Sequence, residues 1–409
     1  MEPMQTISIA GAGCSLLDRL YSPVDFQSAQ FLRYGSKSKG DGGLVPGKLV
    51  FAEELEAFAG RPLPEIIRDI SGGAGPASSN LGGPAIVALI NAAQLLAGGG
   101  IAVRYYGAVG NDESGELIRS IIERSPVDIS HYRTVDGRSP CTYVFSDPTY
   151  HGGHGERTFV NDLAAAWKME PEDLTEDFYA HDILLFGATG LVPRLHDALT
   201  DLVQAAKAHG RVSVVSTVYD FRSEKANPHR RWALGASDET FRHTDLLITD
   251  REEALRLSGT ADLEAACSFF KRRGVSAFVA TCGPDPIRFF SDGRLFRRVE
   301  GEMDISAGVR DRLRAGERAG DTTGCGDNFV GGVLASLAVG LQHKERGDVD
   351  LPSACALGIV SGGFACFYLG GTYLERTPGE KREAIAALYE AYREQTAHTF
   401  AIEPLEAPA

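Results

Sequence analysis

The stretch Asp321-Thr-Thr-Gly-Cys-Gly-Asp327 decides which fold this 409-residue chain is expected to adopt. It runs directly into an apolar pattern at helical spacing, formed by Phe329, Val330, Val333, Leu334, Leu337 and Leu341. The pattern predicts a helix whose exposed N-terminal amides sit in a glycine-rich loop with almost no side-chain bulk. Unpaired N–H groups and the positive end of the helix dipole make such a terminus an anion site. Asp327 adds a proton acceptor to the same turn, and transfer of a phosphoryl group to a hydroxyl requires an anion cradle beside a base.

Composition and charge narrow the class of protein. Hydrophobic residues make up 43% of the chain and charged residues 23%, as in soluble globular proteins. The length suffices for one large α/β domain or two ordinary ones. The formal net charge of −14 argues against nucleic acid and anionic membrane surfaces as partners. The seven cysteines are scattered and form no Cys-x-x-Cys pair, which favours reduced thiols in a cytoplasmic protein over a disulfide framework or a zinc site.

Two segments bear on secretion and membranes. The N-terminus has no basic region, so we expect no secretory signal. The stretch from Leu351 to Leu374 holds no charged residue and is long enough to span a bilayer. It also contains Pro352 and five glycines and lacks the leucine density of a spanning helix. We therefore expect a helix buried against a sheet.

Short β-branched runs alternate with helical patterns along most of the chain. Strands are expected at Thr6–Ala10, Ala102–Gly107, Asp182–Phe186, Val212–Ser216, Leu246–Thr249 and Ala277–Thr281, and helices at Pro84–Leu96, Leu195–Ala208 and Leu263–Arg273. This alternation predicts one α/β domain over residues 1–409, a three-layer α-β-α sandwich around a mainly parallel sheet. A hairpin is expected from Phe289–Ser291 to Leu295–Val299, with its turn at Asp292-Gly293.

Two regions interrupt this rhythm, at residues 19–70 and 131–162. The first holds the Gly/Lys/Ser-rich segment Gly35–Gly43, and the second holds short strand patterns around His151 and His154. Neither fits a βαβ unit. We expect the two regions to form a small β lid over the site.

Two glycine motifs point to other classes of protein, and each is incomplete. Gly11-Ala-Gly13 follows a strand, but Leu16 stands where the dinucleotide fingerprint needs its third glycine, which weakens a nicotinamide-dependent oxidoreductase. The segment from Gly42 to Lys48 matches a P-loop until Leu49, where a Ser/Thr hydroxyl is needed for Mg²⁺.

The complete run from Asp321 to Asp327, followed by Gly331 and Gly332, resembles the phosphate-binding and catalytic segment of the ribokinase-like (PfkB) carbohydrate and nucleoside kinases. Further segments resemble this family in its order across nearly the whole chain, and residues 19–80 resemble its adenosine-kinase-like branch. A bare Gly-x-Gly-Asp would be explained better by an ordinary strand-to-helix turn, with Asp327 as a first-turn residue that the helix dipole favours.

The resemblance implies several substrate-binding residues. Asp18 looks like the strand-end aspartate that grips substrate hydroxyls, and a carboxylate that accepts two hydrogen bonds suits a diol. Its alternative is a surface or capping aspartate. The segment Gly72-Gly73 to Asn80 resembles the Gly-Gly lid hinge and its substrate-facing Asn. Gly82-Gly83 follows closely and is the alternative, but Leu49–Glu54 precedes Gly72-Gly73 much as in adenosine-kinase-like members, which favours the first pair. Asn161, just after the expected lid strand, is a further candidate or a plain turn residue.

The resemblance also assigns the nucleotide and ion sites. Asp250, Thr281, Gly283 and Thr322 are expected to bind ATP, with Asp250 standing where the family carries Asn. Glu253 is expected to organise Mg²⁺ through water, and the alternative is that Asp250 and Glu253 simply begin a helix. Asp321 and Thr323 match positions that bind an activating monovalent cation, K⁺, in several relatives.

These expectations combine into one mechanism. Asp327 acts as base toward a hydroxyl of a sugar or nucleoside, the backbone amides of Gly324, Cys325 and Gly326 form an anion hole for the γ-phosphate of ATP, and the lid excludes water. A ligand-binding or regulatory protein of the same fold is the alternative. The sequence leaves open which sugar or nucleoside is the acceptor, and the resemblance implies a possible homodimer through the lid.

Overall fold

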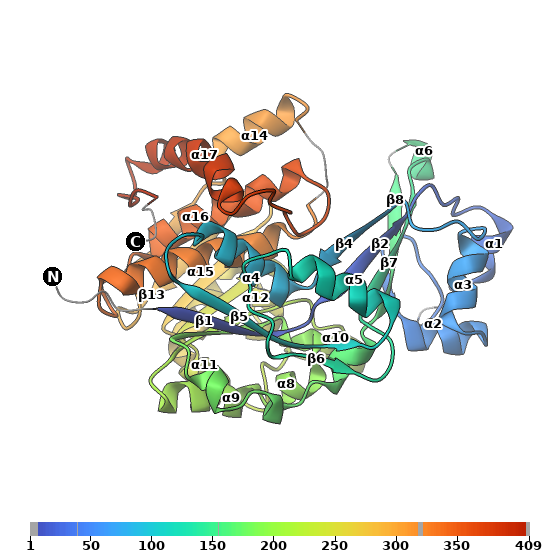
Figure 1. Ribbon diagram of the computed structural model, residues 1–409, viewed down its shortest axis with the longest axis horizontal. Helices are drawn as coiled ribbons and strands as arrows, with labels where there is room; N and C mark the ends of the chain where they lie inside the picture. Colours follow the sequence, from blue (N-terminus) through green and yellow to red (C-terminus); the bar gives the residue numbers. More distant parts are fainter. Residues whose placement is uncertain (1–6, 39, 154, 318–321, 406–409) are drawn as a thin grey trace.

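A nine-stranded sheet runs through the body of the molecule in the computed structural model, which describes residues 7–38, 40–153, 155–317 and 322–405. Within these ranges the strand order is β14-β13-β12-β11-β10-β9-β1-β5-β6 (Figure 1). Neighbouring strands pair in parallel except at β13 and β14, which form an antiparallel edge. The strands are β1 (Ser8–Gly13), β5 (Ala102–Gly110), β6 (Tyr132–Val135), β9 (Ile183–Gly187), β10 (Val212–Ser216), β11 (Leu246–Asp250), β12 (Ala277–Cys282), β13 (Asp285–Ser291) and β14 (Val299–Met303).

Helices cover both faces of this sheet because each strand sends alternate apolar side chains to opposite sides. In β9, Leu185 joins the core on one face, whereas Leu184 and Phe186 join the core on the other. The first face carries α4 (Pro84–Leu95), α5 (Glu113–Ile122), α14 (Ala307–Arg314), α15 (Cys325–His343), α16 (Leu351–Phe364) and α17 (Glu380–Thr396). The second carries α7 (Glu176–Tyr179), α8 (Pro193–Asp197), α9 (Leu199–Ala208), α11 (Glu239–His243), α12 (Arg251–Ser258) and α13 (Leu263–Arg273).

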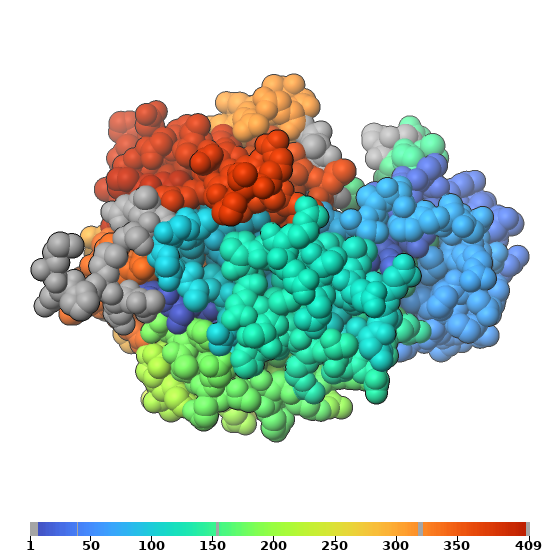
Figure 2. Space-filling view, in the orientation of Figure 1, coloured from blue at the N-terminus to red at the C-terminus, as the bar shows by residue number. Residues whose placement is uncertain are grey.

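The C-terminal helix α17 lies against α4, so the red and cyan segments meet in Figure 2. Short connecting helices complete the body: α10 (Phe221–Ala226) and the 3₁₀ turns η1 (Ala164–Lys168), η2 (Pro171–Asp173), η3 (Thr189–Leu191) and η4 (Ala365–Phe367). The layers confirm the predicted α-β-α sandwich around a mainly parallel sheet.

A second sheet forms a lobe at one end of the molecule, at the right in Figures 1 and 2. Its five strands lie in the order β3-β8-β7-β2-β4, with bounds β2 (Leu16–Tyr21), β3 (Leu49–Phe51), β4 (Ser78–Gly82), β7 (Cys141–Asp147) and β8 (Glu156–Asp162). One face packs on α1 (Ala29–Arg33), α2 (Ala52–Ala59) and α3 (Leu63–Ile70), and α6 (Tyr150–Gly153) caps the β7–β8 connection.

The lid thus differs in extent from the predicted 19–70 and 131–162. It begins at β2 and includes β4, which lies beyond residue 70. Residues 132–135 do not belong to it, because β6 pairs in parallel with β5 in the main sheet.

The order of the strands also indicates where a ligand would bind. From β1 the chain builds β5 and β6 on one side of the sheet and β9 to β14 on the other. In open parallel sheets, ligands bind beyond the carboxyl ends of the strands at such a switch point. Gly13 and Gly187 end the two strands that meet there and pair with each other.

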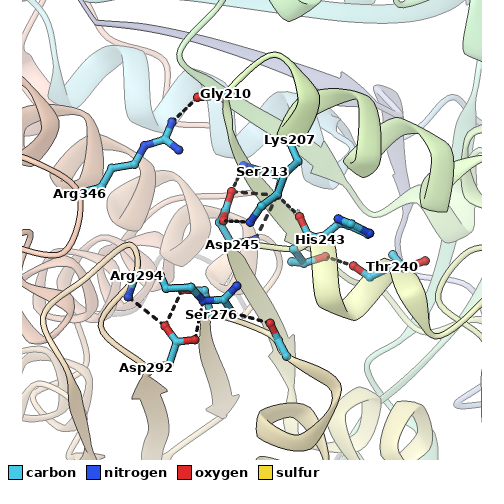
Figure 3. Close-up of polar contacts among 12 residues, drawn as sticks. Lys207, Gly210, Ser213, Thr240, His243, Asp245, Ser276, Asp292, Arg294 and Arg346 are labelled. Atoms are coloured by element: carbon cyan, nitrogen blue, oxygen red, sulfur yellow. Dashed lines mark hydrogen bonds and ion pairs between the residues drawn. The ribbon is translucent and has the colours of Figure 1, made fainter.

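The opposite edge of the sheet, around the ends of β10 to β13, carries a network of hydrogen bonds and ion pairs (Figure 3). Asp245 accepts a hydrogen bond from the Ser213 amide at 3.0 Å and lies 3.6 Å from the Lys207 ammonium. Asp292 accepts from the Ser276 hydroxyl at 2.9 Å and from Arg294 at 2.7 Å. These groups join strand ends to their connections, so this edge stabilises the sheet opposite the expected site.

Most predicted strands lie where expected, and Val212–Ser216 has the predicted bounds. The predicted hairpin strand Leu295–Val299 is wrong. Ser291, the last residue of β13, pairs with Val299, the first residue of β14. Leu295 and Phe296 are buried in the core, so the connection is a long anchored loop rather than a tight turn.

Two predicted helices also need comment. The pattern from Leu195 to Ala208 is divided between α8 and α9, which meet at Ala198. The uncharged segment after Leu351 forms α16, which is a buried helix as predicted, but its main neighbours are the helices α15 and α17 rather than the predicted sheet. Among the described residues, no helix combines the length and the apolar character that crossing a bilayer needs.

Candidate active site

Helix α15 begins at Cys325 and presents its first turn where the glycine-rich stretch ends. Its N-cap is Gly324, whose φ of 75° lies in the left-handed region that favours glycine. A side chain on Gly324 would also collide with the backbone of Gly371, because the two chain segments are in direct contact. Both constraints explain why the sequence has glycine here, and the N-cap itself makes no side-chain hydrogen bond to the helix.

Asp327 lies in this first turn and is partly buried. The protein around the carboxyl group removes enough water to raise the pKa of Asp327 to about 6. A carboxylate with such a pKa is a stronger base than an ordinary aspartate and is still mostly ionised at neutral pH.

Two backbone groups of the predicted anion hole have hydrogen bonds to other described residues. The Cys325 amide donates to the Thr322 carbonyl over 3.3 Å, which is a long hydrogen bond. The Gly324 carbonyl accepts from the Asn328 amide at 2.9 Å, the first regular bond of the helix. Thr322 and Thr323 are exposed, and Asp321 lies outside the described residues, so the K⁺ site stays a prediction.

The predicted nucleotide residues Asp250, Thr281 and Gly283 line one open hollow of about 350 Å³ beyond the carboxyl ends of β11 and β12. Asp250 and Thr281 are direct neighbours in the sheet register. The structure therefore brings together three of the four residues expected to bind ATP, and Thr322 does not line this hollow.

Asp250 and Glu253 form a capping box at the start of α12. The Glu253 amide donates to Asp250 Oδ1 at 2.7 Å, and the Asp250 amide donates to Glu253 Oε2 at 3.0 Å. The Thr217 hydroxyl donates to the same Glu253 oxygen at 2.5 Å. The helix-start alternative is therefore present in the structure, and it uses one of the two Glu253 oxygens.

The carboxyl group of Glu253 also interacts electrostatically with that of Asp327. Burial, then the charge of Asp250 and, more weakly, that of Asp327 raise the pKa of Glu253 to about 7. Burial likewise raises the pKa of Asp250. Within the part of the chain that the structure describes, no cluster of three or more His, Cys, Asp or Glu residues could hold a metal ion.

The three predicted substrate side chains lie in one register row across the lid sheet. Asn80 pairs with Asp18, Asp18 pairs with Thr142, and Thr142 pairs with Asn161. Directly paired residues point to the same face of a sheet. The face with this row is opposite the one that packs on α1–α3, because Val160, next to Asn161 in the chain, belongs to that helical core. We call Asn80, Asp18, Thr142 and Asn161 the polar row.

Both ends of the polar row reach the body of the molecule. Asn80 donates from Nδ2 to the Leu369 carbonyl at 2.5 Å, and this loop continues to Gly371 beside Gly324. At the other end, Asn161 pairs with Phe51, whose ring meets Phe221 edge-on at 5.9 Å. The row thus connects the start of α10 with the turn from Gly324 to Gly326, which we call the anion-hole turn after its predicted role.

Within the row, Asn161 is buried and its Oδ1 has no hydrogen-bond partner among the described residues. A buried amide oxygen without a partner is costly in a folded protein and is expected where a ligand supplies the donor. The Asp18 carboxyl lies against Gly82, and a side chain on Gly82 would collide with Oδ2 of Asp18.

The glycine pair beside Asp18 is Gly82-Gly83, not Gly72-Gly73. Gly82 ends β4, and Gly83 is the N-cap of α4. Gly72 and Gly73 form an exposed turn after α3 and line an open hollow of about 840 Å³, whose lining includes neither Asp18 nor Asp327. The structure gives no support for substrate contacts by Gly72 and Gly73, and it favours the second pair as the hinge.

Some residues of this site were missed in the sequence. Thr142 falls within an expected strand, but nothing local marks it as a neighbour of Asp18. Asn328 follows Asp327 directly and donates from Nδ2 to the Gly324 and Gly371 carbonyls, both at 2.8 Å. The one signal for Asn328 in the sequence is that it is a polar residue at the start of an otherwise apolar helical pattern.

Comparisons with known proteins agree with this arrangement. The model of the pfkB family carbohydrate kinases matches residues 77–377. Aminoimidazole riboside kinase of Salmonella typhimurium is 24% identical over 242 residues, which cover 57% of this chain and 67% of that protein. The 2-dehydro-3-deoxygluconokinase of Bacillus subtilis is 24% identical over 254 residues, covering 60% and 72%.

The fold is also that of solved kinases. Adenosine kinase from Schistosoma mansoni, solved with 2-fluoroadenosine, superimposes with a TM-score of 0.67 at 13% identity, covering 91% of this chain and 99% of that one. The match to the family model covers most of the chain, and the two sheets are those of the solved kinase fold. This chain belongs to the pfkB family of carbohydrate kinases.

Proposed function

We propose that the protein transfers the γ-phosphoryl group of ATP to a hydroxyl of a sugar or nucleoside, with Asp327 as the general base. The observation that carries this proposal is the Asp327 carboxyl in the first turn of a glycine-lined helix terminus, with its pKa raised to about 6 by burial. Base and anion site then belong to one rigid element, so their relative position does not depend on a mobile loop.

In the reaction, the acceptor hydroxyl oxygen attacks the γ-phosphorus and Asp327 takes its proton as the new P–O bond forms. The bond from phosphorus to the β,γ-bridging oxygen breaks, and ADP leaves. Charge on the transferred group is met by the amides of Gly324, Cys325 and Gly326 and by the helix dipole. The long Cys325-to-Thr322 bond supports this role, because a phosphoryl oxygen can replace so weak an acceptor.

ATP is assigned to the hollow lined by Asp250, Thr281 and Gly283. Asp250, which lines this hollow, and Glu253, which is hydrogen-bonded to it, supply carboxylate oxygens of the kind that Mg²⁺ prefers, and the ion when bound would neutralise phosphate charge. Glu253 would hold the ion through water, since one of its oxygens already accepts from Thr217 and Asp250. A K⁺ ion near Asp321 and Thr323 is a further part of the proposal and is tested by comparing K⁺ with Na⁺.

The acceptor is assigned to the polar row. Asp18 can accept from two hydroxyls, and the unpartnered Asn161 oxygen offers a third acceptor. A sugar or a ribose moiety presents hydroxyl donors in such an array. The relatives' names support this class, since they refer to a riboside, a deoxygluconate and adenosine.

The lid would also exclude water, so that ATP hydrolysis does not compete with transfer. We further propose a cytoplasmic homodimer that pairs through lid strands. Sedimentation analysis over a range of protein concentrations tests the dimer, and a monomer at all concentrations would remove it.

A coupled ADP-release assay tests the function across ribose, fructose, 2-keto-3-deoxygluconate, fructose phosphates and ribonucleosides. We expect one acceptor class to support turnover, and Asp327→Asn to lower that turnover by ~10³-fold. The matched control is Asp201→Asn, because Asp201 lies in the first turn of α9 but is exposed and remote from the site. Calorimetric binding of an acceptor without any turnover would instead favour a ligand-binding protein.

A further inference from the structure

Lys381 is a fully buried lysine behind the anion-hole turn. It lies in the first turn of α17 with 0% of its surface exposed. Its Nζ donates to Asn328 Oδ1 at 2.6 Å and lies 3.4 Å from the Tyr368 hydroxyl. No carboxylate forms an ion pair with Lys381 among the described residues. Burial of an amine without a paired carboxylate costs free energy, so the presence of a lysine at this buried position needs an explanation.

Asn328 connects this amine to the catalytic turn. Its Oδ1 receives Lys381 and the Tyr368 hydroxyl, which is 3.2 Å away. Its Nδ2 donates to the Gly324 and Gly371 carbonyls, both at 2.8 Å. These partners fix the orientation of the Asn328 amide. If the amide were flipped, its NH₂ group would face the Lys381 amine, and its oxygen would face the Gly324 and Gly371 carbonyl oxygens.

The two carbonyls belong to segments that touch substrate sites. Gly324 carries the anion-hole turn, and Gly371 packs directly on it. Two residues before Gly371, the Leu369 carbonyl accepts from Asn80 of the polar row. A single buried amide therefore ties the anion-hole turn to the loop that holds the lid.

We propose that Lys381 is a positioning residue for phosphoryl transfer, which keeps Asn328 oriented so that the anion-hole turn stays fixed. This inference rests on the proposed function. Without Lys381, Asn328 loses its strongest donor, its amide can rotate, and the Gly324 and Gly371 carbonyls lose their common partner. The amides of the turn are then less well aimed at the phosphoryl group, which matters most in the transition state.

The role does not depend on the charge of the amine. Burial lowers the pKa of Lys381 to about 7, and the nearby Glu375 carboxylate opposes this shift. Both the ammonium and the neutral amine can donate an N–H group to Asn328.

Lys381→Met keeps the length of the side chain and removes the donor. We expect kcat to fall ~10- to 100-fold, the range for a misaligned transition-state contact, with both KM values changed less than ~3-fold. Tyr392→Phe is the control on the same helix, since the Tyr392 hydroxyl donates to the Asp304 carbonyl at 2.5 Å, away from the site. It should lower thermal stability and leave kcat unchanged.

A double mutant separates positioning from general support of the fold. If Lys381 acts through Asn328, adding Lys381→Met to Asn328→Ala causes no further loss of kcat. An unchanged kcat in Lys381→Met, or a full additive loss in the double mutant, overturns the proposal. Should Lys381→Met not fold, Tyr368→Phe removes the other donor to the same oxygen and should lower kcat ~2- to 5-fold without a change in KM; an unchanged kcat then overturns it.

Hydrogen exchange gives a readout that is independent of turnover. Lys381→Met should speed exchange of the amides from Cys325 to Asn328, whereas Tyr392→Phe should not. Unaltered exchange in Lys381→Met refutes the positioning role even if the wild type phosphorylates no acceptor. Loss of activity in Asp327→Asn tests the proposed function separately.

Discussion

Asp327→Asn is expected to stabilise the protein at alkaline pH while it removes activity. Burial raises the pKa of Asp327 from 3.8 to about 6, and a shift of roughly two units corresponds to ~3 kcal/mol of unfavourable free energy for the ionised carboxylate. The helix dipole favours an anion in this turn by ~0.5–1 kcal/mol, and asparagine loses that. The variant should therefore exceed the wild type by ~2 kcal/mol in free energy of unfolding at pH 8.

The sign follows from which state holds the proton. Between about pH 4 and pH 6 the folded protein keeps a proton that the unfolded chain has released, so the wild type loses stability as the pH rises through this window. Asparagine does not titrate. The advantage of the variant should therefore grow by ~1.4 kcal/mol from pH 5 to pH 8.

Urea denaturation followed by tryptophan fluorescence measures this, since Trp232 is buried. Asp201→Asn is the control, because it removes an exposed aspartate from the first turn of another helix. It should be slightly destabilising, since only the favourable interaction with the helix dipole is lost. A pH-independent difference between Asp327→Asn and the wild type would refute the reasoning. So would a variant less stable than the wild type at pH 8 by as much as the control.

Other expected outcomes follow from the same contacts. The acidic limb of the kcat/KM profile should have an apparent pKa of about 6, set by Asp327, and an ordinary aspartate value would contradict its burial. Asp18→Ala should lower kcat/KM for the acceptor by ~100-fold and leave KM for ATP unchanged, which steady-state kinetics with either substrate varied will show. Glu253→Gln should raise the Mg²⁺ concentration needed for half-maximal activity; an unchanged requirement would limit Glu253 to capping. Because the Cys325 and Cys366 sulfurs lie 3.6 Å apart, oxidised glutathione should convert them to a disulfide and inhibit the enzyme, whereas a Cys366→Ser variant should resist.

Local sequence patterns were sufficient for the main elements of the fold. Strand Val212–Ser216 and helix Leu263–Arg273 have the predicted bounds, since one is a β-branched run and the other lies between Asp262 and Gly274. The hairpin after Ser291 was misplaced because Asp292-Gly293 is a strong turn signal. Burial of Leu295 and Phe296 in the core overrides it.

The site was predictable in its chemistry but not in its layout. Asp327 could be proposed as the base because the glycine-rich loop and this carboxylate are adjacent in the sequence. The polar row could not, because the register of Asn80, Asp18 and Asn161 depends on strands up to about 140 residues apart. The contact of Gly82 with Asp18 could not be predicted either, since only the fold brings the two residues together.

Rapid-quench measurement of a single turnover, with radiolabelled ATP and the preferred acceptor bound at saturation, tests the central role of Asp327 most directly. The rate of phosphoryl transfer in Asp327→Asn should fall by ~10³-fold, within the range of general-base catalysis, while the affinities for ATP and acceptor stay the same. A transfer rate close to that of the wild type would show that another group takes the proton.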